Sequence, residues 1–364
     1  MGTLAAGEKF LRKISFHFRK CVFFLGELRD VRRKRRLYAG VRLTRAQRKE
    51  IQDFYTKYYG KKIPTAWHRL YQSYTGVFRY DYIPEILFCT LYEPKANPYR
   101  RAEFLEDKNI LPLVFSGLEE NGIRVPRVLL SCIEGDLRGA DGRALTESAA
   151  VDLLKAVHEK AVFKKSVYTN SGKDVRIAVP ADTDLEKLLG SLGKNYIVQE
   201  YIQQCAELRK LNPSSVNTFR VPTYRLDGRI YNAPVSLRLG RSGADRDNIH
   251  YGGIGIGVRE DGSLKKTAFT EFGQRFDAHP DTGVVFEGYR IPGAGERLRA
   301  AARLLHEKVP FLGVISWDLT IDSDGMITLI ELNAAGQSAG LPQRVNGEPF
   351  FGENTARVLE SLRR

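Results

Sequence analysis

The chain has 364 residues, a formal net charge of +14 and four cysteines, and its length allows one large or two to three ordinary domains with cores of their own. The cysteines lack the paired spacing of a disulfide framework or a zinc site, so we expect free thiols in a reducing compartment. No apolar run is as long as a membrane span and no clean secretory signal opens the chain, so we expect a cytoplasmic protein.

The positive charge lies mostly near the N-terminus. Residues 9–36 contain eleven Lys or Arg and two acidic residues, and the rest of the chain is close to balanced. Apolar residues recur at helical spacing between Phe10 and Leu37, which predicts an amphipathic helix. Three interpretations stay open: a helix packed on the protein with a solvated basic face, a helix on an anionic membrane at its inner face, or a nucleic-acid-binding helix. No RNP motif or zinc finger follows, so we expect no nucleic-acid partner.

Residues 1–100 are expected to form a basic, mostly helical region. Residues 45–59 have helical periodicity, and the Tyr-, Trp- and Arg-rich stretch 61–81 is also expected to be helical. Two prolines in segment 93–98 interrupt the pattern, which places the end of this region near residue 100.

Residues 101–200 are expected to form an α+β subdomain. A helix is predicted from residue 107, a strand over 123–130, and a further helix after the N-cap Thr146. The sequence AVFKK predicts a strand on which Lys164 shares a face with Val162. A strand lysine is usually a surface residue, but the polar, glycine-containing turn that follows could offer backbone N–H groups to a phosphate.

Residues 201–364 are expected to form a second subdomain. Strands are predicted at 217–223, 229–239 and 252–258, and the glycine-rich connection between the last two has the composition of a mobile active-site loop. Helices are predicted at 295–310 and 354–363.

Residues 311–343 carry a metal-binding signal. GVISWDLTI and MITLIELN predict two strands joined by the turn Asp322–Gly325. Glu331 and Asn333 leave the same face of the second strand, and Asp318 is expected a few residues from register with Glu331. Such oxygen donors are the ligands that Mg²⁺ prefers, with water and phosphate completing its shell. The alternative is a solvated surface hairpin, although a carboxylate that interrupts an apolar strand needs a partner.

The order of these segments resembles the ATP-grasp superfamily, most closely its sugar-transfer-associated branch of bacterial capsule and exopolysaccharide gene clusters. The resemblance covers about residues 80–345, in the family's order. It implies an ATP-grasp fold, in which two α+β subdomains hold ATP between antiparallel sheets, preceded here by the helical N-terminal region. The segments that carry it are NPYRRAEFLEDKN, VFKKSVYTNSGKDV, YIVQEYIQQCAEL, SVNTFRVPT and SWDLTIDSDGMITLIELNAAG.

The resemblance also implies roles for individual residues. Lys108 and Lys164 would reach the nucleotide phosphates, and Arg220 and Arg238 would contact the γ-phosphate or the acceptor. Glu207 would hold the ribose hydroxyls. The alternative for Glu207 is a solvated residue at the start of a helix, and the alternative for Arg220 and Arg238 is that they are charges on a strand surface. Backbone groups of a hinge would bind adenine, and three side chains would hold two Mg²⁺ ions, with Mn²⁺ as the alternative metal. The hinge residues are Gln199, Glu200, Tyr201 and Ile202, and the metal ligands are Asp318, Glu331 and Asn333.

These parts imply an ATP-dependent carboxylate–amine ligase. A substrate carboxylate would attack the γ-phosphorus to form an acyl phosphate, which an amine then displaces. The gene neighbourhood of the branch indicates that an amino acid or amine is joined to a sugar carboxylate, for example a hexuronic acid, in surface polysaccharide biosynthesis. Two alternatives stay open: an ATP-grasp kinase that phosphorylates a hydroxyl, and a non-catalytic membrane-peripheral or nucleic-acid-binding protein on an ATP-grasp scaffold.

Overall fold

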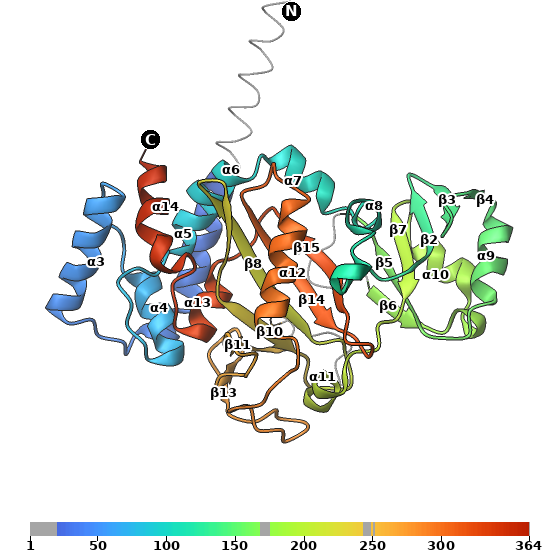
Figure 1. The fold of residues 1–364 in the computed structure, drawn as a ribbon. Coiled ribbons are helices and arrows are strands. Elements are labelled where there is room, and N and C mark those ends of the chain that lie inside the picture. The colour runs from blue at the N-terminus through green and yellow to red at the C-terminus, as the bar shows by residue number, and fades with distance from the viewer. Residues whose placement is uncertain (1–19, 168–174, 243–248, 250–251, 364) are drawn as a thin grey trace, which may run out of the picture. The chain divides into compact units, whose positions relative to one another are not determined.

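The computed structural model describes residues 20–167, 175–242, 249 and 252–363. The chain divides into two compact units, one of residues 1–96 with 336–364 and one of residues 97–335 (Figure 1). The sequence places boundaries near residues 100 and 200 and keeps 201–364 together, whereas the structure groups the end of the chain with its beginning. No helix of the described residues is long and apolar enough to span a bilayer.

The unit of residues 1–96 and 336–364 is helical in its described part. The predicted helix at 10–37 begins outside the described residues, and its described part is helical over 20–33. Pro94 does not end the helical run as the sequence predicts, since it lies in α6, which directly continues the helical residues 88–92. The elements are α2 (Arg35–Tyr38), α3 (Arg45–Tyr58), α4 (Ala66–Thr75), α5 (Glu85–Leu87), the π-helical η1 (Phe88–Tyr92), α6 (Glu93–Ala96), α13 (Gly340–Asn346), η5 (Gly352–Asn354) and α14 (Thr355–Leu362).

Buried polar side chains tie the end of the chain to this unit. Glu93 and Glu85 each accept an amide N–H from residues 337–339, at 2.9 and 3.1 Å. The side chain of Gln343 exchanges two hydrogen bonds with the backbone of Ile83. A buried carboxylate or amide needs such partners, and these are distant in sequence, so local patterns do not reveal this grouping.

The larger sheet of residues 97–335 has the strand order β1-β15-β14-β8-β10-β11-β12-β13 in its described part, with β9 also paired to β8. Strands β1 and β15 are parallel, and the other pairs are antiparallel. Leu298, Ala302 and Leu305 of α12 are buried in the same core as Trp317 of the sheet. The strands are β1 (Ile123–Arg124), β8 (Thr218–Leu226), β9 (Arg229–Asn232), β10 (Val235–Leu239), β11 (Ile254–Val258), β12 (Ala268–Phe269), β13 (Arg275–Phe276), β14 (Val314–Ile321) and β15 (Ile327–Asn333), and the helices are α7 (Tyr99–Leu105), α8 (Leu111–Phe115), η2 (Glu119–Asn121), α11 (Ala206–Leu211) and α12 (Glu296–Glu307).

The smaller sheet has the order β4-β3-β2-β7-β5-β6 in the described residues. Leu154 of α9 and Leu189 of α10 pack with Phe163 in its core. Thr146 caps α9 as predicted, because its hydroxyl accepts the amide N–H of Ala149. The elements are β2 (Val128–Ile133), β3 (Asp136–Gly139), β4 (Ala144–Leu145), α9 (Glu147–Lys155), β5 (Ala161–Lys165), β6 (Val175–Ala178), η3 (Pro180–Asp182), α10 (Leu185–Leu192) and β7 (Tyr196–Glu200).

Three predicted elements are divided in the structure. The strand expected at 123–130 becomes β1 of the larger sheet and β2 of the smaller one, because Pro126 between them has no N–H for a ladder. The strand expected at 229–239 breaks before β10 at Pro234 for the same reason. The helix expected from residue 107 reduces to the short α8 and η2. All four cysteines are free, as predicted: Cys21, Cys89, Cys132 and Cys205.

Candidate phosphate and metal site

The β14–β15 hairpin aligns the three predicted metal ligands. Asp318 pairs directly with Glu331, and Ser316 pairs with Asn333. The sequence places Asp318 a few residues out of register with Glu331, whereas the two residues pair directly, and a β-bulge after Asp318 shifts the pairing of the strands by one residue. Directly opposite residues share a face, so the two carboxylates and the amide leave one side of the hairpin.

Two arginines hold the carboxylate of Asp318. Strand β8 lies beside β14 with Arg220 opposite Asp318, and Arg220 Nε lies 2.7 Å from Asp318 Oδ1. Arg238, on the next strand β10, donates from Nη2 to Asp318 Oδ2 at 2.9 Å and to the hydroxyl of Thr218 at 2.6 Å. Asp318 is 3% exposed, so these guanidinium groups supply the partners that a buried carboxylate requires.

Two buried lysines approach the same carboxylates from outside the larger sheet. Lys108 Nζ lies 2.9 Å from Glu331 Oε1, and the backbone N–H of Lys108 donates to Ser166 O, just after β5. Lys164, on β5, is also buried. Burial and the nearby charge of Lys108 lower the pKa of Lys164 to about 8, while Glu331 acts in the opposite direction. The structure thus brings together all four predicted cationic residues and both predicted carboxylates.

The charge balance of this group suits a polyanion. Four cationic side chains stand against the carboxylates of Asp318 and Glu331, with Glu106 nearby, and burial lowers the pKa of Arg220. A surplus of buried positive charge is costly unless a negative partner arrives. A chain of nucleotide phosphates would supply that partner.

The predicted hinge lies where β7 ends. Gln199 is buried and donates from Nε2 to Pro126 O at 3.2 Å, and the carboxylate of Glu200 pairs with Arg124. The amide N–H of Glu200 donates to Arg127 O, and that of Tyr201 donates to Lys160 O. Among the residues that the structure describes, the amide N–H of Ile202 has no such backbone partner, and the predicted contact of the hinge with adenine stays a prediction.

Glu207 lies in the first turn of α11, and its backbone carbonyl accepts a hydrogen bond from the hydroxyl of Tyr289. In the described part of the chain, no hydrogen bond or ion pair joins Glu207 to the lysines and arginines above. Its predicted contact with ribose stays a prediction.

Two positioning residues escape sequence reasoning. Asn97 donates to the carbonyls of Val314 and Ala334 and accepts the amides of Gly313 and Val314, which ties the start of β14 to the end of β15. Glu106 accepts the amides of residues 334 and 335, at 2.9 and 2.8 Å, just after Asn333. Burial raises the pKa of Glu106, and the two amide donors partly offset this effect. Both lie in the segment NPYRRAEFLEDKN that carries part of the family resemblance, which is the one sequence signal that points to them.

The donor set fits a hard divalent cation that shares its shell with phosphate. Asp318 and Glu331 supply carboxylates, and Asn333 uses its Nδ2 toward Ser316 O, which leaves its Oδ1 as an acceptor. Within the described ranges, no group of three or more His, Cys, Asp or Glu side chains could hold a metal ion. A site with two carboxylates and one amide therefore depends on ligand oxygens from water or nucleotide, which is usual for Mg²⁺.

The chain belongs to the sugar-transfer associated ATP-grasp family, whose sequence pattern it matches over residues 87–358. Its fold is accordingly an ATP-grasp fold, with a helical N-terminal region before the two sheets. A search among curated proteins gave no match.

Several solved structures are partly similar to this chain. They include the VanG D-Ala:D-Ser ligase from Enterococcus faecalis, at 13% identity, 72% coverage of this chain, 62% of that chain and a TM-score of 0.43. Biotin carboxylase from Campylobacter jejuni matches at 16% identity, with 71% coverage of this chain, 46% of that chain and a TM-score of 0.42. Our chain spans less than two thirds of the length of these chains, and at this level of likeness the comparison carries no argument about activity.

Proposed function

We propose that the protein is an ADP-forming carboxylate–amine ligase that uses ATP and Mg²⁺. Its substrates would be a small-molecule carboxylate, most specifically a hexuronic acid of a sugar derivative, and an amino acid or other amine. The product would serve surface polysaccharide biosynthesis. Family membership supports ATP use and a link to sugar transfer.

The observation that carries the proposal is the row Glu331–Asp318–Arg220 across three neighbouring strands, with Lys108 paired to Glu331 and Arg238 paired to Asp318. Each of the two carboxylates is paired with at least one cation. In such a row, the carboxylates hold metal and the cations hold the phosphoryl oxygens of the group that is transferred.

The chemistry needs no nucleophilic side chain. An oxygen of the substrate carboxylate attacks the γ-phosphorus, the bond to the β,γ-bridging oxygen breaks, and ADP leaves with the electron pair. The amine then attacks the acyl carbon, inorganic phosphate departs, and the amine loses a proton to the medium. Bound Mg²⁺ would neutralise charge on the β- and γ-phosphates. Arg220 and Arg238 would orient the γ-phosphoryl group or the acceptor carboxylate, and Lys108 and Lys164 would hold the remaining phosphate oxygens.

Mass spectrometry of a pooled reaction tests the function. The protein is incubated with Mg²⁺-ATP, nucleotide-linked hexuronic acids and a mixture of amino acids, with Glu331→Gln as the control. A sugar that gains one amino acid less water, together with ADP, is the expected product. A sugar that gains only a phosphoryl group would show a kinase instead. Unchanged ATP in every pool, without measurable ATP binding, would contradict any nucleotide-dependent function.

We further propose that the N-terminal helix attaches the enzyme to the inner face of an anionic membrane. Four consecutive apolar residues on it, Val22 to Leu25, are 38–64% exposed. Basic residues precede and follow them, at Lys20 and over 29–36. Exposed aromatic and aliphatic side chains beside Lys and Arg are typical of helices that lie in the headgroup region of anionic bilayers.

A further inference from the structure

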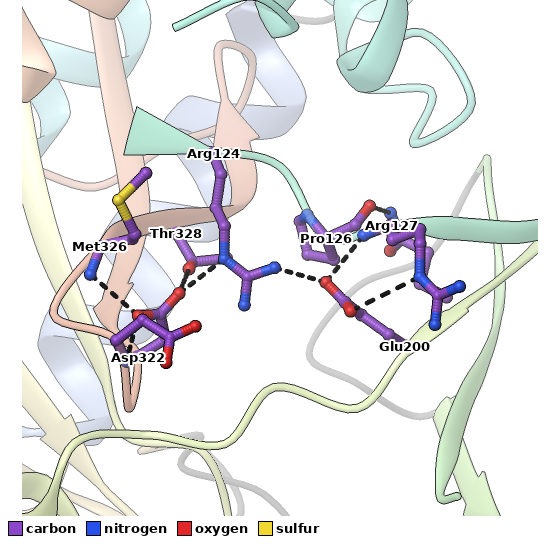
Figure 2. Close-up of polar contacts among 9 residues, drawn as sticks. Arg124, Pro126, Arg127, Glu200, Asp322, Met326 and Thr328 are labelled. Carbon is purple, nitrogen blue, oxygen red and sulfur yellow. Dashed lines mark hydrogen bonds and ion pairs between the residues drawn. The ribbon is translucent and has the colours of Figure 1, made fainter. Parts of the chain in front are cut away.

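Arg124, the last residue of β1, bonds one carboxylate of each sheet region (Figure 2). Its Nε donates to Asp322 Oδ2 at 2.6 Å, and its Nη1 donates to Glu200 Oε1 at 2.5 Å. Asp322 lies in the turn between β14 and β15, and Glu200 is the last residue of β7. One guanidinium therefore joins the turn of the candidate metal hairpin to the start of the candidate hinge.

The Asp322 end of this bridge is rigid. Asp322 is fully buried, and its Oδ1 accepts the amides of Asp324 and Met326 at 3.0 and 2.8 Å. Its Oδ2 accepts the hydroxyl of Thr328 at 3.1 Å in addition to Arg124 (Figure 2). A buried carboxylate with four donors has one orientation, so Arg124 is anchored to the hairpin that carries the proposed metal ligands.

The Glu200 end is shared with Arg127. Glu200 Oε1 also accepts the backbone N–H of Arg127 at 3.0 Å, and Oε2 lies 3.8 Å from Arg127 Nε. The side chain of Arg127 is 70% exposed and pairs with Glu200, whereas that of Arg124 is 25% exposed and pairs with both Glu200 and Asp322. Arg124 and Arg127 are thus a matched pair of arginines, of which only Arg124 bridges.

The chain beyond Glu200 returns to the same hairpin. Ser323 N donates to Gln203 O at 2.7 Å, and Cys205 N donates to Ile321 O at 2.9 Å. The segment 200–205 is therefore held at its far end by backbone hydrogen bonds and at its near end by Arg124. Tyr201 and Ile202, two of the four proposed hinge residues, lie between the two attachments.

We propose that Arg124 is a positioning residue that fixes the distance between the adenine-binding hinge and the metal hairpin, so that one nucleotide meets both. This inference rests on the proposed function, since it takes adenine to bind at the hinge. A nucleotide held at its base presents its phosphates to the metal site at a high effective concentration, which raises the affinity for ATP. This gain in affinity depends on a constant distance between the hinge and the metal hairpin. Without the bridge by Arg124, the hinge and the hairpin each keep their own contacts with the nucleotide, but the gain in affinity from binding at both places falls.

The test measures the coupling between base and metal binding. The dissociation constant of ATP is determined by calorimetry with EDTA and with saturating Mg²⁺, for the wild type, Arg124→Ala, Arg124→Lys and Arg127→Ala. The ratio of the two constants reports how much the metal adds to ATP binding. We expect Arg124→Ala to lower this ratio about fivefold or more, Arg124→Lys to lower it less, and Arg127→Ala to leave it within about twofold.

The outcomes separate the inference from the function on which it rests. An unchanged ratio in Arg124→Ala would overturn the positioning role while leaving ATP binding intact. The same conclusion holds where both constants weaken equally, because the ratio is then unchanged and general damage to the fold explains the loss of affinity. No ATP binding by the wild type would refute the proposed function, and the inference with it. Arg124→Lys retains the positive charge and covers the case in which Arg124→Ala fails to fold.

Discussion

Lys108 forms an ion pair with Glu331 at 2.9 Å, so a proposed phosphate ligand neutralises a proposed metal ligand. Lys108 is also bonded through its backbone to Ser166 beside the smaller sheet, whereas Glu331 lies on β15 of the larger one. When Mg²⁺-ATP binds, two new pairs would replace the pair between Lys108 and Glu331. Glu331 would pair with the metal, and Lys108 would pair with a phosphate. No charge is left unpaired in the exchange, which keeps its cost low although Lys108 is buried and the side chain of Glu331 is only 33% exposed.

Replacement of Glu331 tests the metal assignment. Glu331→Gln keeps the size of the side chain but removes its charge, so we expect Mg²⁺-dependent ADP formation to fall about a hundredfold or more. ADP release is measured with the substrates identified in the pooled reaction. Glu287→Gln, at a side chain that is 61% exposed, is the matched control. A fully active Glu331→Gln enzyme would show that the carboxylate holds no essential metal.

Lys164 should contribute to ATP binding at the expense of stability. Its pKa is lowered to about 8, from an ordinary 10.5, chiefly by burial, so holding its charge costs roughly 3 kcal/mol in the folded state. We expect Lys164→Met to weaken ATP binding at least about tenfold and to raise the free energy of unfolding at neutral pH by about 1–3 kcal/mol. Calorimetry and urea unfolding measure the two effects. The neighbouring Lys165→Met is the control, and equal ATP affinity of both variants would contradict the phosphate role.

Asn97 should be a large single contributor to the stability of residues 97–335. It is 3% exposed and makes four hydrogen bonds with the backbone of β14 and the residue after β15. We expect Asn97→Ala to lower the free energy of unfolding by about 2–4 kcal/mol, because buried backbone groups lose their partners. Asn97→Asp keeps the oxygen that accepts the two backbone amides. It replaces the donating NH₂ group by a second oxygen, which then faces the two carbonyls. It should therefore be no more stable than Asn97→Ala, and a fully stable Asn97→Asp would argue against the hydrogen-bond assignment.

Buried histidines should make the protein lose stability in mild acid. Burial lowers the pKa of His306 to about 4, and its ring is bonded to Thr223 and to Leu312 O. The unfolded chain takes up the proton near pH 6.5 and the folded chain near pH 4, so stability falls as the pH falls between these values. The loss for this residue is roughly 3 kcal/mol.

Tryptophan fluorescence can isolate this effect. The chain has two tryptophans, and Trp317 donates to the same Thr223 that bonds His306, whereas Trp67 belongs to the other compact unit. Urea unfolding of a Trp67→Phe protein, followed at pH 7 and pH 4.5, therefore reports on Trp317 and its surroundings. His306→Gln should show a smaller difference between the two pH values, and an unchanged difference would assign the acid sensitivity to other groups.

Membrane attachment predicts a specific pattern of vesicle binding. The wild type should sediment with phosphatidylglycerol vesicles. Binding should be weaker to phosphatidylcholine vesicles, and high salt should weaken binding to the phosphatidylglycerol vesicles. Replacement of Phe24 and Leu25 by Ser should weaken this binding about tenfold, because both side chains leave the bilayer interface. Leu113→Ser, at an apolar residue that is 75% exposed elsewhere, is the control. Equal binding of all three proteins would exclude the helix as the anchor.

The sequence by itself determined the local elements and the identity of the chemical groups. The β14–β15 hairpin follows from alternating apolar residues and the Asp322–Gly325 turn, since both signals lie within a few neighbouring residues. The same alternation places Glu331 and Asn333 on one face. The family resemblance named the cationic residues, and the structure gathers them around the two carboxylates.

The tertiary structure alone decided which of these groups meet. The order of β15, β14, β8 and β10 sets Arg220 and Arg238 beside Asp318, and no local pattern fixes the neighbours of a strand. Pro126 divides a predicted strand between two sheets, which leaves Arg124 at the point where it reaches both Glu200 and Asp322. Buried polar groups find partners far away in sequence, because burial is a property of the packed chain and not of a segment.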